Sequence, residues 1–572
     1  MPISEKDADA LKKNSGRFKL IEQFLADGID YMFGNPGTVE QGFLDAVSEY
    51  PQMKYILTLQ ESVAILMGDG YARALKKPAL VQIHSSPGLG NSIGAMYQAM
   101  RGHAPLVIIG SDAGLKYIPM EAQMYGDLVG FAKPVTKWAT MVLDQASLLR
   151  TLRRAIKIAS TPPMGPVYVC IPADILDKPC LEEVIPTFIP STRVVPNEEF
   201  LKEAVTLLAN SKTPMIFMGD GIAYADAKAE LEKIAEMLGA EIWGVDSGEL
   251  NVSYTHPLYK GETGHMFGTS SFPITSKGDV NLICGTYMIP EVFPKLDNIY
   301  APNAKVIHID LNAYQISQNH PVDLGVVSCP KLTLAKLADV LATTMTQSQK
   351  DLAQLRCHEL ATAKAEKINI EKESDRKLRN DVPIQASRFM EELAGALPNL
   401  DEVCIFDEAL TCSPALTRYL PPTTPNQFLQ TRGGSLGVGF PGALALKLAF
   451  PEKTVFGFSG DGGSMYTIQA LWTAAHHKIG TKFVVCNNQA YMLLKLNILQ
   501  YWRDQVKVDE HDFPDSFSLK NPVIDFVKIA ESMGVPAIRI TTPDDIKPAI
   551  QQALNHDGPF LIDLMLTDAV PT

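Results

Sequence analysis

The sequence predicts an α/β protein made of three doubly wound parallel-sheet domains. The first observation is that short apolar runs alternate with longer stretches of helical period along the chain. Uninterrupted runs of Val, Ile and Leu are typical of strands that are buried on both faces of a parallel sheet. The second observation is that two segments break this alternation and divide the 572 residues into three units of ordinary domain size.

The first unit is expected at residues 1–185. Its pattern predicts a helix over residues 18–26, a second helix over 62–75, and strands at 31–33, 79–83, 106–110 and 167–172. Proline and polar residues at 186–196 then indicate a linker.

The second unit is expected at residues 195–345, with a helix at 198–208 and strands at 215–218, 280–284 and 305–310. Residues 346–380 are rich in charge and nearly free of turn residues, which predicts a helical linker. The third unit, at residues 381–572, contains apolar strands at 454–458 and 483–486.

Composition excludes several classes of partner. The formal net charge of −13 argues against nucleic acid and against an anionic membrane. Residues 78–100 are uncharged and as long as a membrane span, but Gly, Pro and Ser interrupt them, so we expect a buried active-site loop. The N-terminus lacks the apolar core of a secretory signal. The eight cysteines form no CxxC pair, and we expect a cytoplasmic protein with reduced thiols.

Polar residues at the ends of two neighbouring apolar strands predict a metal site. Gly460, Asp461 and Gly462 follow the first strand, and Asn488 follows the second. A carboxylate and a carboxamide there can converge on Mg²⁺, which also takes phosphate oxygens as ligands. The glycines let backbone N–H groups approach a phosphate, and a helix expected to begin near Tyr466 would direct its positive end there. The alternative is an ordinary turn after each strand.

Seven segments, taken in order, carry a resemblance to a known family. They are FGNPGT (33–38), LTLQES (57–62), DGYARA (69–74), HSSPGLGN (84–91), GPVYVCIP (165–172), GGSLGVGFPGALA (433–445), and GDG…NN with ALWTAA between. Their order and spacing resemble the thiamin diphosphate (ThDP)-dependent decarboxylase/carboligase family, and most nearly benzoylformate decarboxylase. The resemblance implies pyrimidine-binding, central and diphosphate-binding domains, with ThDP and Mg²⁺ as cofactors.

The resemblance also implies three catalytic residues. Glu61 would hydrogen-bond the cofactor's aminopyrimidine ring and control its tautomer by acid–base exchange. His84 would orient the substrate carboxylate and move a proton, and Thr38 would contact the substrate. The alternatives are a first-turn or N-cap glutamate at position 61 and a structural histidine at position 84.

The remaining site residues are also implied by the resemblance. The cofactor contacts would be Gly434, Leu436, Thr411, Gly460, Asp461, Gly462, Gly463, Ser464, Asn488 and Tyr491. Leu436 would be the wedge between the two cofactor rings, although a core leucine is the alternative. Asp461, Asn488 and Ala490 would bind the metal. Thr38, His84, Met492, Leu493 and Leu494 would line the substrate pocket, but core packing accounts equally well for the last three.

One departure from the family affects the expected reaction. Benzoylformate decarboxylase has a second catalytic histidine in its central domain, whereas residues 285–293 contain none, and Glu291 is a weak substitute. Without that imidazole, the enamine would be protonated more slowly, would live longer and could attack an aldehyde or a second 2-oxo acid.

The expected function is decarboxylation of a 2-oxo acid by a ThDP-dependent C–C lyase, through a C2 ylide and an enamine. The alternative is a carboligase or lyase that resembles acetolactate synthase or 2-hydroxyacyl lyase and forms or cleaves a 2-hydroxy ketone. The implied partners are a small 2-oxo acid or aldehyde and further copies of the chain, in a homodimer or homotetramer with active sites at subunit interfaces. A non-catalytic relative that only binds ThDP or dimerises is a different class. A nicotinamide or flavin oxidoreductase lacks support, because no GxGxxG fingerprint is present.

Overall fold

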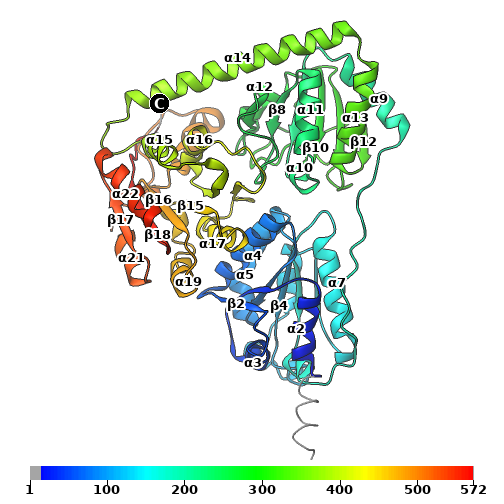
Figure 1. Cartoon of the computed structure of the whole chain (residues 1–572), viewed down its shortest axis with the longest axis vertical. Coiled ribbons are helices and arrows are strands. Elements are labelled where there is room, and N and C mark those ends of the chain that lie inside the picture. The colour runs from blue at the N-terminus through cyan, green and yellow to red at the C-terminus, as the bar shows by residue number, and fades with distance from the viewer. Residues whose placement is uncertain (1–13, 571–572) are drawn as a thin grey trace, which may run out of the picture.

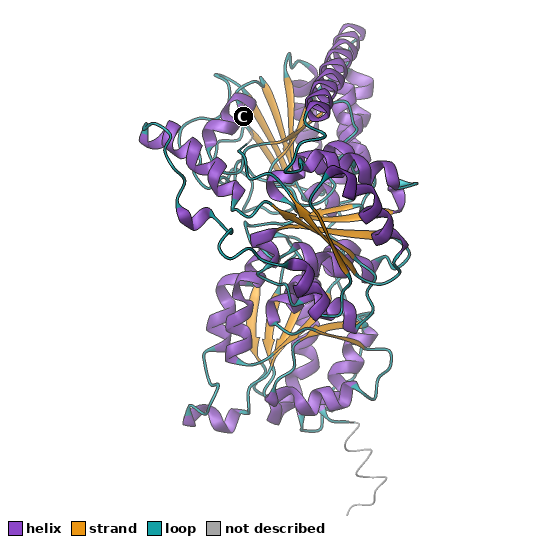
Figure 2. Cartoon of the chain, turned by 90° about the vertical axis from the view of Figure 1, so that its left-hand side faces the viewer, coloured by secondary structure: helices purple, strands orange, loops and turns teal. Residues whose placement is uncertain are grey.

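The computed structural model describes residues 14–570 and contains three six-stranded sheets (Figure 1). Every pairing between the named strands is parallel, and helices cover the sheets on both faces (Figure 2). The predicted fold class is therefore confirmed. Residues 1–13, which belong to the first predicted unit, lie outside the described residues.

The N-terminal sheet has the strand order β2-β1-β3-β4-β6-β5. Its strands are β1 (Tyr31–Gly34), β2 (Lys54–Leu57), β3 (Ala79–Ile83), β4 (Leu106–Gly110), β5 (Trp138–Met141) and β6 (Val167–Cys170). The helices are α2 (Gly16–Ala26), α3 (Gln41–Val47), α4 (Glu61–Leu75), α5 (Ser86–Arg101), α6 (Leu128–Ala132), α7 (Leu148–Ser160) and α8 (Ala173–Leu176).

The central sheet has the order β12-β11-β10-β7-β8-β9. Its strands are β7 (Pro214–Met218), β8 (Glu241–Gly244), β9 (Tyr259–Glu262), β10 (Val280–Cys284), β11 (Lys305–Asp310) and β12 (Leu324–Val327). The helices are α9 (Glu198–Ala209), α10 (Gly221–Tyr224), α11 (Lys228–Leu238), α12 (Gly268–Thr275) and α13 (Pro330–Thr344). The helix predicted for the second linker is α14 (Gln347–Lys377), which begins with a capping box between Thr346 and Gln349.

The C-terminal sheet has the order β14-β13-β15-β16-β18-β17. Its strands are β13 (Val403–Glu408), β14 (Phe428–Gln430), β15 (Thr454–Gly460), β16 (Lys482–Asn487), β17 (Ala537–Ile540) and β18 (Phe560–Met565). The helices are α15 (Ala386–Ala396), α16 (Ser413–Tyr419), α17 (Gly439–Ala449), α18 (Asp461–Ser464), α19 (Ala470–His476), α20 (Met492–Gln500), α21 (Phe526–Ser532) and α22 (Pro543–Asn555).

Two local predictions were wrong. Residues 78–100 were expected to contain a buried active-site loop, but after β3 nearly all of them belong to α5, with Pro87 in its first turn and the Ser85 hydroxyl accepting from the Ser86 N–H at 2.7 Å. The helix expected near Tyr466 is also absent there. Instead α18 begins at Asp461 and α19 begins at Ala470. No helix in residues 14–570 is long and apolar enough to cross a membrane.

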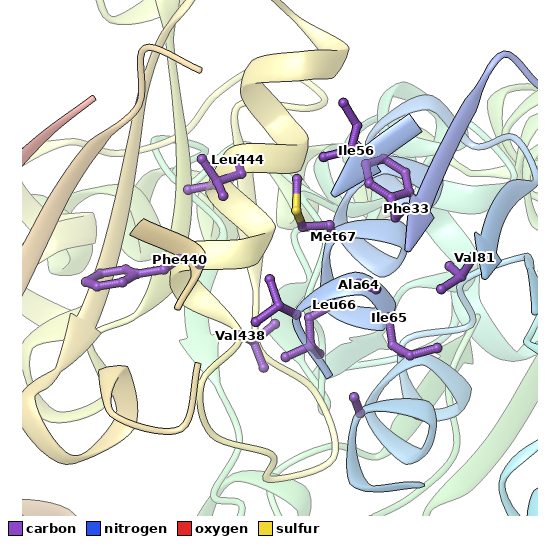
Figure 3. Close-up of a cluster of buried hydrophobic side chains, with 14 of the residues drawn as sticks. Phe33, Ile56, Ala64, Ile65, Leu66, Met67, Val81, Val438, Phe440 and Leu444 are labelled. Carbon is purple, nitrogen blue, oxygen red and sulfur yellow. The ribbon is translucent and has the colours of Figure 1, made fainter. Parts of the chain in front are cut away.

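The N-terminal and C-terminal domains share one apolar core, in which α4 packs against α17 (Figure 3). Leu66 and Met67 of α4 lie in the same buried cluster as Val438 and Leu444. A Cβ on Gly70 would lie 3.0 Å from Ala445 Cβ, so a glycine allows the close approach of the two helices. This core fixes the first sheet relative to the third.

Candidate active site

Glu61 lies where β2 gives way to α4, at the carboxyl edge of the N-terminal sheet. It is the first residue of α4 and only 8% exposed. The side chain of Gln60 caps the helix by accepting from the Ser62 N–H at 2.6 Å, so Glu61 is not needed as the cap. Asn91 Nδ2 donates to Glu61 Oε2 at 3.1 Å, and a Cβ on Gly88 would lie 3.0 Å from Glu61 Oε1. Gly88 thus leaves room beside a carboxylate that retains acceptor capacity.

His84 lies between β3 and α5, on the other side of the same glycine. A Cβ on Gly88 would also lie 3.0 Å from His84 Cβ, so Glu61 and His84 flank one position. His84 Nδ1 lies 2.9 Å from Glu40 Oε2, and Nε2 lies 3.3 Å from Met124 Sδ. A Cβ on Gly37 would lie 1.9 Å from His84 Nδ1, which shows that the ring rests on the Gly37 backbone.

Thr38 begins the short 3₁₀ helix Thr38–Glu40, directly after Gly37. Its side chain is exposed, whereas Glu40 at the other end of the turn is 2% exposed. The turn therefore presents a hydroxyl outward and a carboxylate inward, close to His84.

Asp461 is the buried carboxylate at the carboxyl end of β15, and its surroundings suit a residue that binds a cation. Its Oδ1 accepts from the Gly462 N–H at 2.8 Å, whereas Oδ2 is buried with no hydrogen-bond partner among the described residues. Burial is the main cause that raises the pKa of Asp461 to about 6. A buried oxygen without a partner is costly, and a divalent cation would supply the missing charge.

The loop after β16 lies against Asp461. Backbone N–H groups of Gln489 and Ala490 face this carboxylate and oppose the rise of its pKa. Asn488 Oδ1 accepts from the Ala490 N–H at 3.0 Å, and the Ala490 carbonyl accepts from Met492 N at 2.9 Å. The three residues predicted to bind metal are therefore brought together. Their role as metal ligands stays a prediction.

Of the three glycines around Asp461, Gly460 borders open space, whereas Gly462 and Gly463 allow neighbouring side chains to pack closely. A Cβ on Gly460 would meet nothing within 4 Å, so this position is open. A Cβ on Gly462 would lie 2.4 Å from the Tyr491 ring, and one on Gly463 would lie 3.1 Å from Ser459 Oγ. Ser464, which is buried, donates from Oγ to the Asp461 carbonyl at 3.0 Å.

The loop that carries Leu436 is held by a buried carboxylate. Glu408 Oε1 accepts from Gly437 N at 2.5 Å, and Oε2 accepts from Gly439 N at 2.7 Å and from Ser459 Oγ at 3.1 Å. Burial raises the pKa of Glu408 to about 7, although these donors oppose the rise. Gly434 has a φ of 73°, which favours glycine, and a Cβ there would meet nothing within 4 Å. A ligand could therefore approach the backbone closely at this position.

The other predicted site residues differ in exposure. Thr411 lies in the 3₁₀ helix Leu410–Cys412 and is half-buried. In α20, Met492 is 6% exposed and Leu494 is 42% exposed, so only some of the predicted pocket residues 492–494 belong to the core. In the central domain, the Ser271 hydroxyl donates to Glu291 Oε1, and burial raises the pKa of Glu291.

Sequence reasoning missed three residues that hold the site together. They are Asn91 beside Glu61, Glu40 beside His84, and Glu408 beneath the Leu436 loop. Asn91 is the last residue of the HSSPGLGN segment, and Glu408 lies three residues before Thr411. Glu40, two residues after Thr38, carried one available signal, since it is an acidic residue in the short connection that follows the buried strand β1.

The two sets of residues lie on different domains. No hydrogen bond or ion pair recorded within residues 14–570 joins Glu61, His84 or Thr38 to the residues around Asp461. Each set lies at the carboxyl edge of its own sheet, where ligands bind in parallel α/β folds.

A cavity of about 500 Å³ lies elsewhere, between the N-terminal and central domains. It opens at the carboxyl ends of β7, β10 and β11, and Arg101, Asp310 and Arg432 contribute to its lining. None of the predicted site residues lines it. The N–H groups of Gly219 and Gly221 beside it already donate to protein carbonyls.

Comparison with known families matches three consecutive parts of the chain. Residues 16–138 match the thiamine pyrophosphate enzyme N-terminal TPP binding domain, residues 201–337 the central domain, and residues 410–564 the C-terminal TPP binding domain. Thiamine pyrophosphate is ThDP under another name.

Individual proteins agree with this result. The acetolactate synthase large subunit of Haemophilus influenzae is 30% identical, over 95% of this chain and 93% of that protein. Benzoylformate decarboxylase of Pseudomonas aeruginosa is 27% identical, over 94% of this chain and 96% of that protein. The structure of a thiamine diphosphate-dependent 4-hydroxybenzoylformate decarboxylase from Rhodococcus jostii RHA1 superposes with a TM-score of 0.83 at 22% identity, and covers 97% of this chain and 100% of that one.

The three matched domains follow one another along the chain in the same order as the three sheets. The predicted cofactor residues lie on the N-terminal and C-terminal domains. The chain therefore belongs to the ThDP-dependent decarboxylase and acetolactate synthase family of enzymes.

Proposed function

We propose that this protein is a ThDP- and Mg²⁺-dependent C–C lyase that decarboxylates an apolar 2-oxo acid. The observation that carries the proposal is the placement of Glu61 and His84 on either side of Gly88. An acid–base group for the cofactor and one for the substrate would then lie at one site.

ThDP, when bound, supplies a nucleophilic carbon and an electron sink for the electrons that carbon dioxide leaves behind. Glu61 would exchange a proton with the aminopyrimidine ring, since its carboxylate is 8% exposed and bonded only on Oε2 by Asn91. Asp461, Asn488 and Ala490 would hold Mg²⁺ against the diphosphate. Gly460, Gly462, Gly463, Ser464 and Thr411 would surround the phosphates, and Tyr491 would close the site from the side of Gly462.

The Leu436 loop would set the shape of the bound cofactor. Glu408 fixes the backbone on both sides of Val438, which holds Leu436 in place, and the open Gly434 would approach the aminopyrimidine. Thr38 and His84 would bind the substrate carboxylate, and Met492, Leu493 and Leu494 would form an apolar wall. The exposed Leu494 supports a pocket role more than a core role.

We also propose that the complete active site forms between two chains. The support is that the Glu61 set and the Asp461 set lie on different domains, while α4 and α17 pack between these domains in one chain. A homodimer is then the smallest active unit, and a homotetramer is two such dimers. The free thiols of all eight cysteines are consistent with a cytoplasmic location.

Carboligation is the second candidate, and two observations favour it. The relatives include acetolactate synthases, one of them 30% identical. In addition, residues 285–293 provide no histidine, and Glu291 is already bonded to Ser271. Slower proton delivery would favour transfer of the bound fragment to an aldehyde or a second 2-oxo acid.

One assay separates the two candidates. The purified protein is incubated with ThDP, Mg²⁺ and either pyruvate or benzoylformate, and the aldehyde and the acyloin are quantified by chromatography. Aldehyde from benzoylformate as the main product is expected. Acyloin as the main product would support the carboligase, and no turnover of either acid by protein with bound ThDP would overturn both.

A further inference from the structure

The carboxylate of Glu40 lies beside His84 and has no role in the function proposed above. Glu40 is 2% exposed, and its Oε2 lies 2.9 Å from His84 Nδ1. The Oε1 atom is buried and has no hydrogen-bond partner among the described side chains and backbone, although the N–H groups of Glu40 and Ser111 are nearby. A buried carboxylate with one strong partner acts mainly on that partner.

The surroundings of Glu40 show why it is specific for His84. Burial raises the pKa of Glu40, and the charge and hydrogen bond of His84 are the largest effects that oppose the rise. Neither a Lys nor an Arg is among the groups with the largest effects on the pKa of Glu40, and its other ionisable neighbours, Tyr55, Tyr168 and Cys170, carry no positive charge. The imidazole is therefore the main positive partner of this carboxylate.

The two ring nitrogens of His84 have different tasks. The Nδ1 atom is committed to Glu40, and Nε2 faces the Met124 thioether at 3.3 Å. A thioether accepts hydrogen bonds only weakly and cannot fix a proton. A carboxylate on one imidazole nitrogen keeps the proton there and leaves the other nitrogen for proton exchange.

We propose that Glu40 is a positioning residue that holds the Nδ1 proton of His84, so that Nε2 is the atom that exchanges a proton with the substrate. In that exchange the Nε2–H bond breaks, its electron pair stays on the ring, and the proton passes to the substrate-derived carbon or oxygen. Solvent water then restores the Nε2 proton, and the Nδ1 proton remains on the pair throughout. The proton exchange with the substrate rests on the proposed function, whereas the tautomer of His84 does not.

The first test compares Glu40→Gln with Glu236→Gln. The control pair has similar chemistry at a distance from the site, because Glu236 Oε1 lies 3.3 Å from His256 Nε2 in the central domain. Glu40→Gln should lower kcat by roughly 10- to 100-fold with KM within about threefold. It should also move the alkaline limb of the kcat profile to lower pH by about one unit, because a negative charge beside the ring is lost. Glu236→Gln should change neither.

The second test is a double-mutant cycle. If Glu40 acts through His84, Glu40→Gln should cost less than about twofold in a His84→Ala background. Losses that multiply would overturn the proposal, as would a Glu40→Gln enzyme with an unchanged pH profile. Glu40→Asp, which keeps the charge on a shorter side chain, should recover part of the activity.

The third test needs no substrate and no cofactor. Protein labelled with ¹⁵N-histidine is compared by two-dimensional NMR, and His84→Ala identifies the signal. Wild type should show His84 with a proton on Nδ1, and Glu40→Gln should show a mixture of tautomers. Identical His84 signals would overturn the proposal. If wild type turns over no 2-oxo acid but shows the expected tautomer, the proposed function fails and the pair stands.

Discussion

Arg73 Nε donates a hydrogen bond to Glu249 Oε1 at 2.8 Å, and this pair joins the N-terminal domain to the central domain out of reach of solvent. Arg73 also contacts Asp69 at 3.4 Å and donates to the Gln430 carbonyl at 3.0 Å. One guanidinium thus connects all three domains, next to the start of the loop that carries Leu436.

Replacing Arg73 should destabilise the protein strongly. Arg73→Met removes the ion-pair partner of the buried Glu249 and Asp69, which should lower the free energy of unfolding by roughly 3–5 kcal/mol in urea denaturation. The control is Arg150→Met, since Arg150 is 67% exposed in its pair with Glu182 and should contribute at most about 1 kcal/mol. Equal effects of the two substitutions would show that the buried pair does not hold the domains together.

Gly37 should be essential for the position of His84. In Gly37→Ala the new Cβ would lie 1.9 Å from His84 Nδ1, so the ring must leave Glu40. We expect kcat to fall by about 100-fold while ThDP affinity, measured by calorimetry, stays within a few-fold. Gly395→Ala is the control, because that Cβ would meet nothing within 4 Å in α15. This control should keep full activity and gain about 0.5–1 kcal/mol in stability.

The local pattern predicted the three sheets and α14, because apolar runs and helical spacing are properties of short segments. It did not predict α5, whose start contains two serines, a proline and two glycines. The glycine at position 88 is explained by packing, since a side chain there would meet Glu61 and His84. Tertiary contact, which a local pattern does not contain, outweighs the low helix propensity of glycine.

The residues of the site were predicted more completely than their partners. Glu61 and Asp461 follow strands, and the resemblance assigned their roles. The pairs Glu40–His84 and Asn91–Glu61 depend on the strand order β2-β1-β3, which places the ends of three strands side by side. Strand order follows from long-range packing, so residues 44 and 30 positions apart could not be paired in advance.

The pH dependence of stability should report Glu408. Its pKa is raised from 4.5 to about 7 by burial, so ionisation is less favourable in the folded state than in the unfolded state. Apo wild type should therefore lose stability relative to Glu408→Gln as the pH rises from about 4 to 7, by about 3 kcal/mol, with little change above that. Urea denaturation at about pH 4 and pH 8 measures the difference. A constant difference would show that Glu408 is ionised equally in both states.

Glu61→Gln should separate binding from proton transfer. The amide keeps the size of the side chain and a hydrogen bond to Asn91, but it cannot exchange a proton with the aminopyrimidine. We expect ThDP and Mg²⁺ to bind within about tenfold of wild type by calorimetry, while exchange of the thiazolium C2 proton into D₂O becomes undetectable by NMR. Glu203→Gln on the exposed face of α9 serves as the control. Normal C2 exchange in Glu61→Gln would assign the acid–base role to another residue.

Asp461→Asn should have opposite effects on the free and the loaded protein. Without metal, the buried carboxylate lacks a partner on Oδ2, and burial raises its pKa to about 6, so at about pH 8 its charge destabilises the fold. The neutral amide removes that charge, and apo Asp461→Asn should melt at the same temperature as apo wild type or higher. With Mg²⁺ and ThDP the order should reverse, because a carboxylate is the stronger ligand for a hard cation. Thermal melts with a chelator, and with Mg²⁺ and ThDP, measure the melting temperatures of the two states. Asp339→Asn is the control, because Asp339 is exposed. An Asn variant that Mg²⁺ and ThDP stabilise as much as wild type would place the cation elsewhere.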